Sequence, residues 1–336
     1  MSFLDRLPFR RPSGPLSPDG RLASDLWLDQ RSARRRIRKS LRRGELEAER
    51  AEQLRQFVER GYLILSLDLD EQIFQQIDAT VERLWNERPA DVAYAYHSLL
   101  TRFSDARAEH RRPSYRIADL HTRCEAALAL YLNREIFDVI EQIFGEPAVA
   151  TQSLYFEWGS QQGLHRDPVY VQMARPSHLA AAWIALEDVG PDCGPLVYVP
   201  GSHRLPYYQF APDRYTFDHS VDGNDALEAS QEWDRQHCAQ ARLELETLTC
   251  RRGDVLIWHH SLLHGGSYPK DPALTRKSFV VHYTTLASMS VLRNSYVAPG
   301  QETPSVYTSE RILERDGCHG FDSPLHVHSS SVGQDG

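Results

Sequence analysis

The chain has 336 residues, a formal net charge of −8 at pH 7 and 41% hydrophobic residues. This length gives one large domain or two small ones with a sizeable core. The acidic balance disfavours a protein whose whole surface binds nucleic acid, so no nucleic-acid partner is expected. No apolar run approaches the roughly 18 residues needed to span a bilayer. The five cysteines include no Cys-x-x-Cys pair and fit neither a disulfide framework nor a zinc ribbon, which favours the reducing cytoplasm.

Residues 1–48 are predicted to form a basic, Pro/Arg-rich N-terminal arm. Prolines disfavour regular structure at its start, and the start lacks the long apolar segment of a secretory signal. Eight of the residues from 31 to 43 are Arg or Lys. One interpretation is contact with an anionic membrane surface, a polyanion or an acidic partner. The other is a solvated helix end beside the acid-rich stretch 45–59. Nothing in the sequence indicates an oligomeric state.

Residues 49–145 are predicted to form a mainly helical entry region. Apolar residues recur at three- and four-residue spacings over 69–87 and over 134–145, which indicates two helices with one apolar face each. Gly145 is a plausible stop for the second helix. Residues 61–65 form a short strand-like run between the helical stretches.

Residues 146–290 change character and are predicted to form a jelly roll. Short runs rich in Val, Ile, Tyr, Trp and Thr are separated by Gly and Pro turns, a pattern typical of a β-sandwich or jelly roll rather than a parallel α/β sheet. These runs are 148–159, 179–189, 194–203, 241–250, 253–266 and 276–286. Residues 205–240 interrupt them as an insertion, which is expected to be a lid or to carry a helix of its own. Residues 291–336 form a C-terminal extension.

The stretch "GLHRDPVY" is the first candidate for a metal site. On a strand, residues two apart point to the same face, so His165 and Asp167 are expected to bind one ion with the intervening arginine turned away. A third ligand must come from a distant strand, and the run 253–266 offers His259, His260 and His264. The glycines that follow His264 allow the backbone to approach a ligand closely, which favours it over the other two.

Two histidines and one carboxylate leave three coordination positions open, as in the facial triad of non-haem Fe(II) oxygenases. If the cosubstrate is 2-oxoglutarate, its far carboxylate needs a bidentate cation, and arginine has the right geometry. Arg276 lies on the next strand, and Ser278 points to the same side and offers a hydroxyl.

These motifs together resemble the phytanoyl-CoA dioxygenase family of Fe(II)/2-oxoglutarate oxygenases. The segments that carry the resemblance are "HRD" (165–167), 181–203, 253–267 and "RKS" (276–278). The resemblance implies a mainly β fold, a double-stranded β-helix of the cupin-like jelly-roll type flanked by helices, as a single domain over 49–290. It implies Fe(II) bound by His165, Asp167 and His264. It places 2-oxoglutarate against Arg276 and Ser278 with Trp183 lining the pocket, and His259 matches a recurrent family histidine.

The implied reaction hydroxylates an unactivated C–H bond of a small molecule or a lipid or natural-product intermediate, with O2 as cosubstrate and succinate and CO2 as products. Asp167 favours hydroxylation over halogenation, although desaturation and cyclisation need the same residues. Two rival hypotheses stay open: a non-oxidative cupin-like isomerase or sugar-binding protein, and a non-catalytic interaction protein that works through the arm.

Several other side chains near these motifs have weaker assignments. Tyr170, Arg175 and His178 follow the metal motif and are candidates for substrate contact. His203 is expected to order a turn. The pair of histidines at 326–328 is interpreted as accidental.

Overall fold

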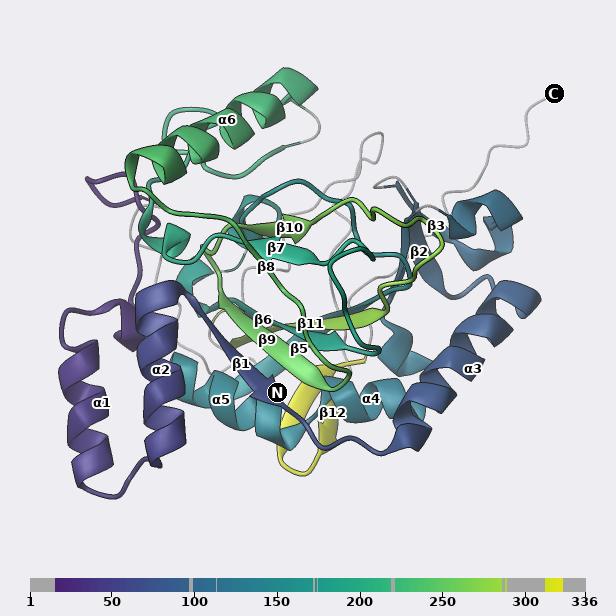
Figure 1. Ribbon diagram of the computed structural model, residues 1–336, viewed down its shortest axis with the longest axis horizontal. Helices are drawn as coiled ribbons and strands as arrows, with labels where there is room; N and C mark the ends of the chain where they lie inside the picture. Colours follow the sequence, from purple (N-terminus) through teal and green to yellow (C-terminus); the bar gives the residue numbers. More distant parts are fainter. Residues whose placement is uncertain are drawn as a thin grey trace, which may run out of the picture.

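Two mainly antiparallel sheets face each other and form the centre of the molecule (Figure 1). The computed structural model describes residues 16–96, 99–112, 114–171, 173, 175–218, 221–285, 288 and 312–322. The large sheet has the order β1-β9-β6-β11-β5-β4-β2-β3, with β12 and β13 attached to it, and the small sheet has the order β10-β7-β8. The predicted two-sheet jelly roll with a helical N-terminal region is therefore confirmed.

The strands are short, as their turn-punctuated sequences predict. They are β1 (Tyr62–Ser66), β2 (Ala93–Tyr96), β3 (Leu99–Arg102), β4 (Tyr115–Ala118), β5 (Ala148–Phe156), β6 (Ala180–Ala185), β7 (Leu196–Tyr198), β8 (Glu246–Thr247), β9 (Asp254–His259), β10 (His264–Gly266), β11 (Ser278–Thr285), β12 (Ile312–Arg315) and β13 (Cys318–Phe321).

Helices cover the outer face of the large sheet and the flanks of the molecule (Figure 1). They are α1 (Ala33–Arg42), α2 (Ala48–Arg60), α3 (Glu71–Glu87), α4 (Glu125–Tyr131), α5 (Arg134–Phe144) and α6 (Asn224–Gln240). Asn133 caps α5 by accepting a hydrogen bond from the Ile136 amide at 3.1 Å, and Gly145 ends the helix with a φ of 72°. Among the described helices, none is long and apolar enough to cross a membrane.

Alternation along β11 separates two cores. Phe279, Val281 and Tyr283 belong to the core shared with the helices. Val280 belongs instead to the core between the sheets, together with Trp183 of β6 and other inward-facing side chains. Because successive strand residues point to opposite faces, Ser278 and His282 face the inside of the jelly roll with Val280. The functional candidates of this strand therefore share one interior.

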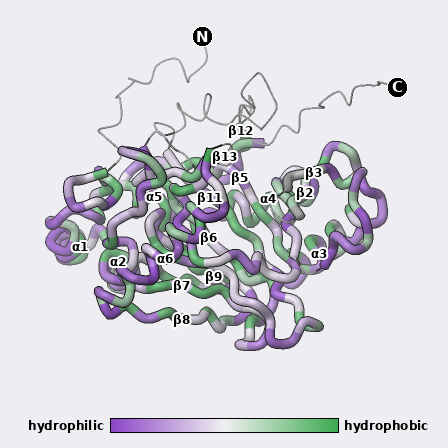
Figure 2. Tube along the Cα trace, turned by 90° about the horizontal axis from the view of Figure 1, so that it is seen from above, coloured by the Kyte–Doolittle hydropathy of each residue, from purple (hydrophilic) through white to green (hydrophobic). Residues whose placement is uncertain are grey.

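The segment predicted as an arm packs closely against the domain from residue 22 onward. Leu26, Leu28 and Ile37 are buried in the main core, and the Trp27 indole donates a hydrogen bond to the Gln142 carbonyl at 2.8 Å. Figure 2 colours much of α1 hydrophilic, because its basic side chains face outward while Ile37 faces inward.

The C-terminal extension also contacts the domain. β12 and β13 form a hairpin, and β13 pairs in parallel with β5 at Gly320 and Ala150. The His121 Nε2 lies 3.1 Å from the Phe321 carbonyl and 2.7 Å from the Asp322 carbonyl. The histidines at 326–328 lie outside the described residues.

The insertion at 205–240 carries the helix α6, which lies above the small sheet in Figure 1. We refer to its described residues, 205–218 and 221–240, as the cap segment. Of the two predicted possibilities, a helix of its own is present, and its position over the metal motif is described below.

Candidate metal centre and its surroundings

The polar turn at His165 is held against β10. His165 and His264 exchange two backbone hydrogen bonds with N···O distances of 2.9 and 3.1 Å, and the pairing is an isolated bridge. Asp167 then begins a 3-10 turn that ends at Val169. The prediction that His165 and Asp167 lie on one regular strand is wrong, because Pro168 has no amide hydrogen to continue a ladder. The turn nevertheless points both side chains to one place.

The three candidate ligands converge on a common point. The Oδ1 atom of Asp167 lies 3.4 Å from His264 Nε2 and 3.9 Å from His165 Nε2, and the possible ligand atoms all lie within 4.8 Å of one another. His165 Nδ1 lies 2.9 Å from the Gly163 carbonyl, and His264 Nδ1 lies 3.0 Å from the Leu262 carbonyl. A carbonyl can only accept, so each Nδ1 carries a proton, and Nε2 is the nitrogen that each histidine would offer to a metal ion. These residues fit a divalent metal ion.

The protonation states also suit metal binding. Burial acts to raise the pKa of Asp167, but His264, His282 and His165 outweigh it and hold that pKa below its ordinary value. Burial, assisted by His264, lowers the pKa of His165 to about 4. At neutral pH the group therefore offers an ionised carboxylate and a neutral imidazole, the forms that bind metal.

Two further side chains orient the carboxylate, and sequence reasoning missed both. The Trp258 indole donates a hydrogen bond to Asp167 Oδ2 at 2.7 Å, and His282 Nε2 lies 3.9 Å from the same oxygen. Gln152 Nε2 lies 3.0 Å from His282 Nδ1. For His282 the sequence did carry a signal. This histidine lies four residues after Ser278 on the same strand, so the alternation of side chains places both inside the jelly roll.

The predicted cosubstrate residues form a buried group. Arg276 donates to Ser278 Oγ at 3.3 Å, and its guanidinium lies 5.4 Å from the Trp183 ring centroid. Within the described residues Arg276 has no ion-pair partner, and its buried Nε has no hydrogen-bond partner. Burial lowers the pKa of Arg276 to about 10. An isolated buried cation is costly, so the pocket fits an anion such as a carboxylate.

Gly159 makes room for this guanidinium. Its φ is +78°, and a Cβ at this position would lie 2.7 Å from Arg276 Nη2. A larger residue would therefore push Arg276 out of its place.

His259 and His260, the alternative third ligands, belong to a different group. Together with Asp29 they form what we call the second cluster. His259 Nε2 lies 3.0 Å from Asp29 Oδ1, and the Ser261 amide donates to His259 Nδ1 at 3.1 Å. His203, in the turn Ser202–Arg204, lies beside this cluster with its ring centroid 5.0 Å from that of His259.

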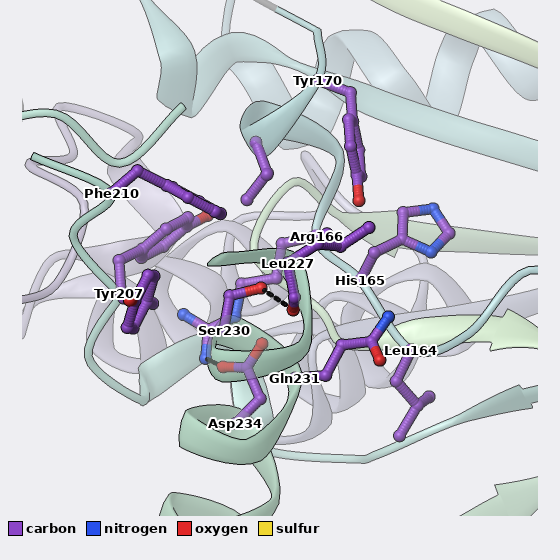
Figure 3. Close-up of a pocket in the computed structure, with 12 residues that line it drawn as sticks. Leu164, His165, Arg166, Tyr170, Tyr207, Phe210, Leu227, Ser230, Gln231 and Asp234 are labelled. Carbon is purple, nitrogen blue, oxygen red and sulfur yellow. Dashed lines mark hydrogen bonds and ion pairs between the residues drawn. The ribbon is translucent and has the colours of Figure 1, made fainter. Parts of the chain in front are cut away.

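The cap segment is fastened to the metal motif by Arg166. This buried side chain points away from the candidate ligands, as the sequence predicts, and forms a 2.7 Å ion pair with Asp234 of α6. Its Nη1 donates to the Leu205 and Pro206 carbonyls at 3.2 and 3.1 Å, and its guanidinium lies 4.4 Å from the Tyr207 ring centroid. Figure 3 shows the pocket that results between α6 and His165.

Of the three candidates for substrate contact, one lines this pocket. Tyr170 does so, but Arg175 and His178 do not. Arg175 forms an ion pair with Glu146 at 2.9 Å, and His178 Nδ1 lies 3.2 Å from Asp25. Both side chains also contact Asp25 and so fasten the N-terminal segment to the domain, and their contact with substrate stays a prediction.

A family model for phytanoyl-CoA dioxygenase matches residues 57–270 of the chain. The peroxisomal phytanoyl-CoA dioxygenase of Bos taurus is 28% identical over 125 residues, which cover 37% of this chain and 34% of the bovine protein. The match thus spans about a third of that relative's length.

Solved structures share the fold. The epimerase SnoN of nogalamycin biosynthesis has a TM-score of 0.53 at 17% identity, with 82% of this chain and 98% of that chain covered. The carbocyclase SnoK has a TM-score of 0.52 at 20% identity, with 72% and 85% covered. EctD from S. alaskensis, solved with 2-oxoglutarate and 5-hydroxyectoine, has a TM-score of 0.50 at 18% identity, with 84% and 88% covered.

Proposed function

The chain belongs to the phytanoyl-CoA dioxygenase family, and we propose that it is an Fe(II)- and 2-oxoglutarate-dependent oxygenase that hydroxylates an unactivated C–H bond of a small molecule. The observation that carries the proposal is the convergence of two histidine Nε2 atoms and Asp167 Oδ1 within 4.8 Å. Such a facial set leaves positions open for cosubstrate and dioxygen. The bound iron supplies the oxidising chemistry, in which 2-oxoglutarate, O2 and R–H become succinate, CO2 and R–OH.

The protein's own part is binding and orientation. His165, Asp167 and His264 would hold the iron. The hydrogen bond from Trp258 fixes Asp167 Oδ2 and leaves Oδ1 beside the two histidines. Arg276 and Ser278 bind the far carboxylate of 2-oxoglutarate, and Trp183 forms a wall of that pocket. Because these groups are buried, water is kept from the reacting atoms.

Hydroxylation is proposed over halogenation because Asp167 is present at the ligand position that halogenation would leave to a halide. The similar structures SnoK and SnoN are named a carbocyclase and an epimerase, and ring closure would use the same residues. The rival non-oxidative isomerase has no use for a buried, unpaired Arg276. The cosubstrate site therefore distinguishes the two functions.

The test is anaerobic titration of the purified protein with Fe(II) and 2-oxoglutarate, followed by admission of air and measurement of succinate. We expect one iron per chain and succinate formation that requires both additions. His165→Ala should lose both, whereas His319→Ala, an exposed histidine of β13, should keep both. Succinate formation at the wild-type rate by His165→Ala, or metal-dependent isomerisation without loss of 2-oxoglutarate, would contradict the proposal.

A further inference from the structure

The pocket beside His165 has aromatic walls. It lies between the metal-ligand turn and α6, and its lining includes His165, Tyr170, Tyr208 and Phe210 (Figure 3). Tyr170 is 36% exposed, and Tyr208 and Phe210 are half-buried. Their ring faces are therefore open to a ligand, in contrast to Tyr207, which is buried behind them under Arg166.

Aromatic rings form a continuous series that starts at the candidate ligand, in which the buried Phe217 connects the open rings. Tyr170 meets His165 edge-on with centroids 5.7 Å apart, and Phe217 follows at 6.3 Å from Tyr170. Phe210 lies 5.5 Å from Phe217, and Tyr208 lies 5.0 Å from Phe210. A ligand stacked on this surface would have its edge next to the metal centre.

The charges of the pocket cancel. Arg166 and Asp234 are lining residues, and they form an ion pair with each other. Arg166 Nη1 donates to backbone carbonyls, and its buried Nε has no hydrogen-bond partner among the described residues. Among the described lining residues no other Arg or Lys is present. A phosphate or carboxylate in this pocket would therefore meet only a guanidinium whose charge Asp234 already offsets, which leaves its desolvation largely uncompensated.

Neutral hydrogen-bonding groups come from α6. The Gln231 amide lies over Gly163, where a Cβ would come within 3.2 Å of Nε2. Ser230 Oγ donates to the Leu227 carbonyl at 2.8 Å and keeps its acceptor lone pairs. An amide and a hydroxyl beside aromatic faces are the groups that recognise hydroxyls on a ring.

We propose that the open aromatic surface around this pocket, whose enclosed volume of about 20 Å³ has room for about one water, is the substrate site and that this surface binds the face of an uncharged, hydroxylated ring. The inference rests on the proposed function, because it assumes that oxidation takes place beside His165. The required chemistry is shared by a sugar ring and by a flat polycyclic phenol. It disfavours an acyl-CoA, whose phosphates need cations that are not already paired, as Arg166 is with Asp234.

The experiment measures binding of three probes to the wild-type protein by saturation-transfer NMR: methyl β-glucopyranoside, a dihydroxyanthraquinone sulfonamide and octanoyl-CoA. We expect saturation of the protons of at least one ring probe, and the two ring probes separate the sugar source from the phenol source. Tyr170→Ala and Gln231→Ala should weaken that binding at least tenfold. The matched controls are Tyr268→Ala, a tyrosine that is 75% exposed, and Gln236→Ala, an exposed residue of α6; both should bind as the wild type does.

Three results would overturn the inference: no binding of either ring probe, ring binding that neither pocket substitution changes, or binding of octanoyl-CoA that Tyr170→Ala removes. Conversion of 2-oxoglutarate to succinate without substrate is measured alongside. If this conversion occurs while the ring probes fail to bind, the pocket assignment is wrong and the oxygenase function stands. If a ring probe binds as expected but no succinate forms, the pocket assignment stands and the oxygenase function fails.

Discussion

The metal centre and the second cluster contain the same residue types, and they differ in where the protons are. Each has two histidines and one aspartate with possible ligand atoms within 4.8 Å. In the metal centre, backbone carbonyls accept from both Nδ1 atoms and leave Nε2 as the nitrogen offered to a metal ion. In the second cluster, a backbone amide donates to His259 Nδ1, so the Nε2 proton is directed at Asp29. The hydrogen-bond partner of Nδ1 therefore decides whether Nε2 of the same ring is available to a metal ion.

The second cluster has a structural task instead. Asp29 ends the 3-10 turn Trp27–Asp29, so its bond to His259 fastens the N-terminal segment to β9. Burial is the main cause of the low pKa of His260, and its Nδ1 has no hydrogen-bond partner among the described residues. The cluster therefore holds the neutral imidazole of His260 beside the His259–Asp29 pair.

The largest expected effect separates the two groups by iron content. His264→Ala should lose bound iron and reduce succinate formation by more than about 100-fold, since even changes around metal ligands cost about 10–100-fold. His260→Ala should keep one iron per chain. Iron is measured by mass spectrometry of the desalted protein. Two irons in the wild type, with one lost in His260→Ala, would mean that the second cluster is also a metal site.

The next effect concerns the cosubstrate. Arg276→Gln should raise the KM for 2-oxoglutarate about 10–100-fold, because a charge-assisted hydrogen bond is worth about 1.5–3 kcal/mol. Iron content should not change. Arg252→Gln, which removes an exposed ion pair with Glu71, is the control. An unchanged KM in Arg276→Gln would place the cosubstrate carboxylate elsewhere.

A smaller effect is expected from breaking the second cluster. Asp29→Ala should lower the free energy of unfolding by about 1–3 kcal/mol, the cost of leaving the buried His259 donor unsatisfied. The measurement is urea unfolding of the metal-free protein. Removal of the exposed Asp192–Lys270 pair by Asp192→Ala should cost less than about 1 kcal/mol. Equal losses of unfolding free energy in the two variants would show that the Asp29–His259 contact does not stabilise the N-terminal segment.

The smallest effect is on the pH dependence of stability. The pKa of His260 is lower in the folded protein than its ordinary value of 6.5, mainly through burial. At a pH between the folded and the unfolded pKa of His260, the unfolded chain binds one proton more than the folded chain does. The free energy of unfolding is therefore highest above pH 6.5. It falls as the pH drops below 6.5, by at most about 1.4 kcal/mol per pH unit for one proton. Urea unfolding at pH 7.5 and 5.5 should show a smaller difference in His260→Phe than in the wild type. An equal difference in the two proteins would show that His260 does not contribute to the pH dependence of stability.

Local patterns in the sequence were enough to predict the jelly roll and the helices over 69–87 and 134–145. The candidate ligands could also be named, because His165, Asp167 and His264 lie in short motifs beside turns. Contacts between distant residues could not be predicted. Asp29 and His259 are 230 positions apart. Arg166 forms its ion pair with Asp234 in an insertion whose helix has only a weak apolar pattern. Such pairs follow from tertiary packing, which single-sequence periodicity does not contain.

The pairing of β13 with β5 has a consequence for the order of folding. His121 and Phe321, which meet at this junction, are 200 residues apart in the chain, so the loop between them must close before the contact can form. During synthesis the earlier strands and helices emerge first, while the outer edge of β5 near Ala150 waits for residues 318–322. Contacts of such long range slow the search for the native topology. We expect the last described residues to dock late, as the step that completes an already assembled jelly roll.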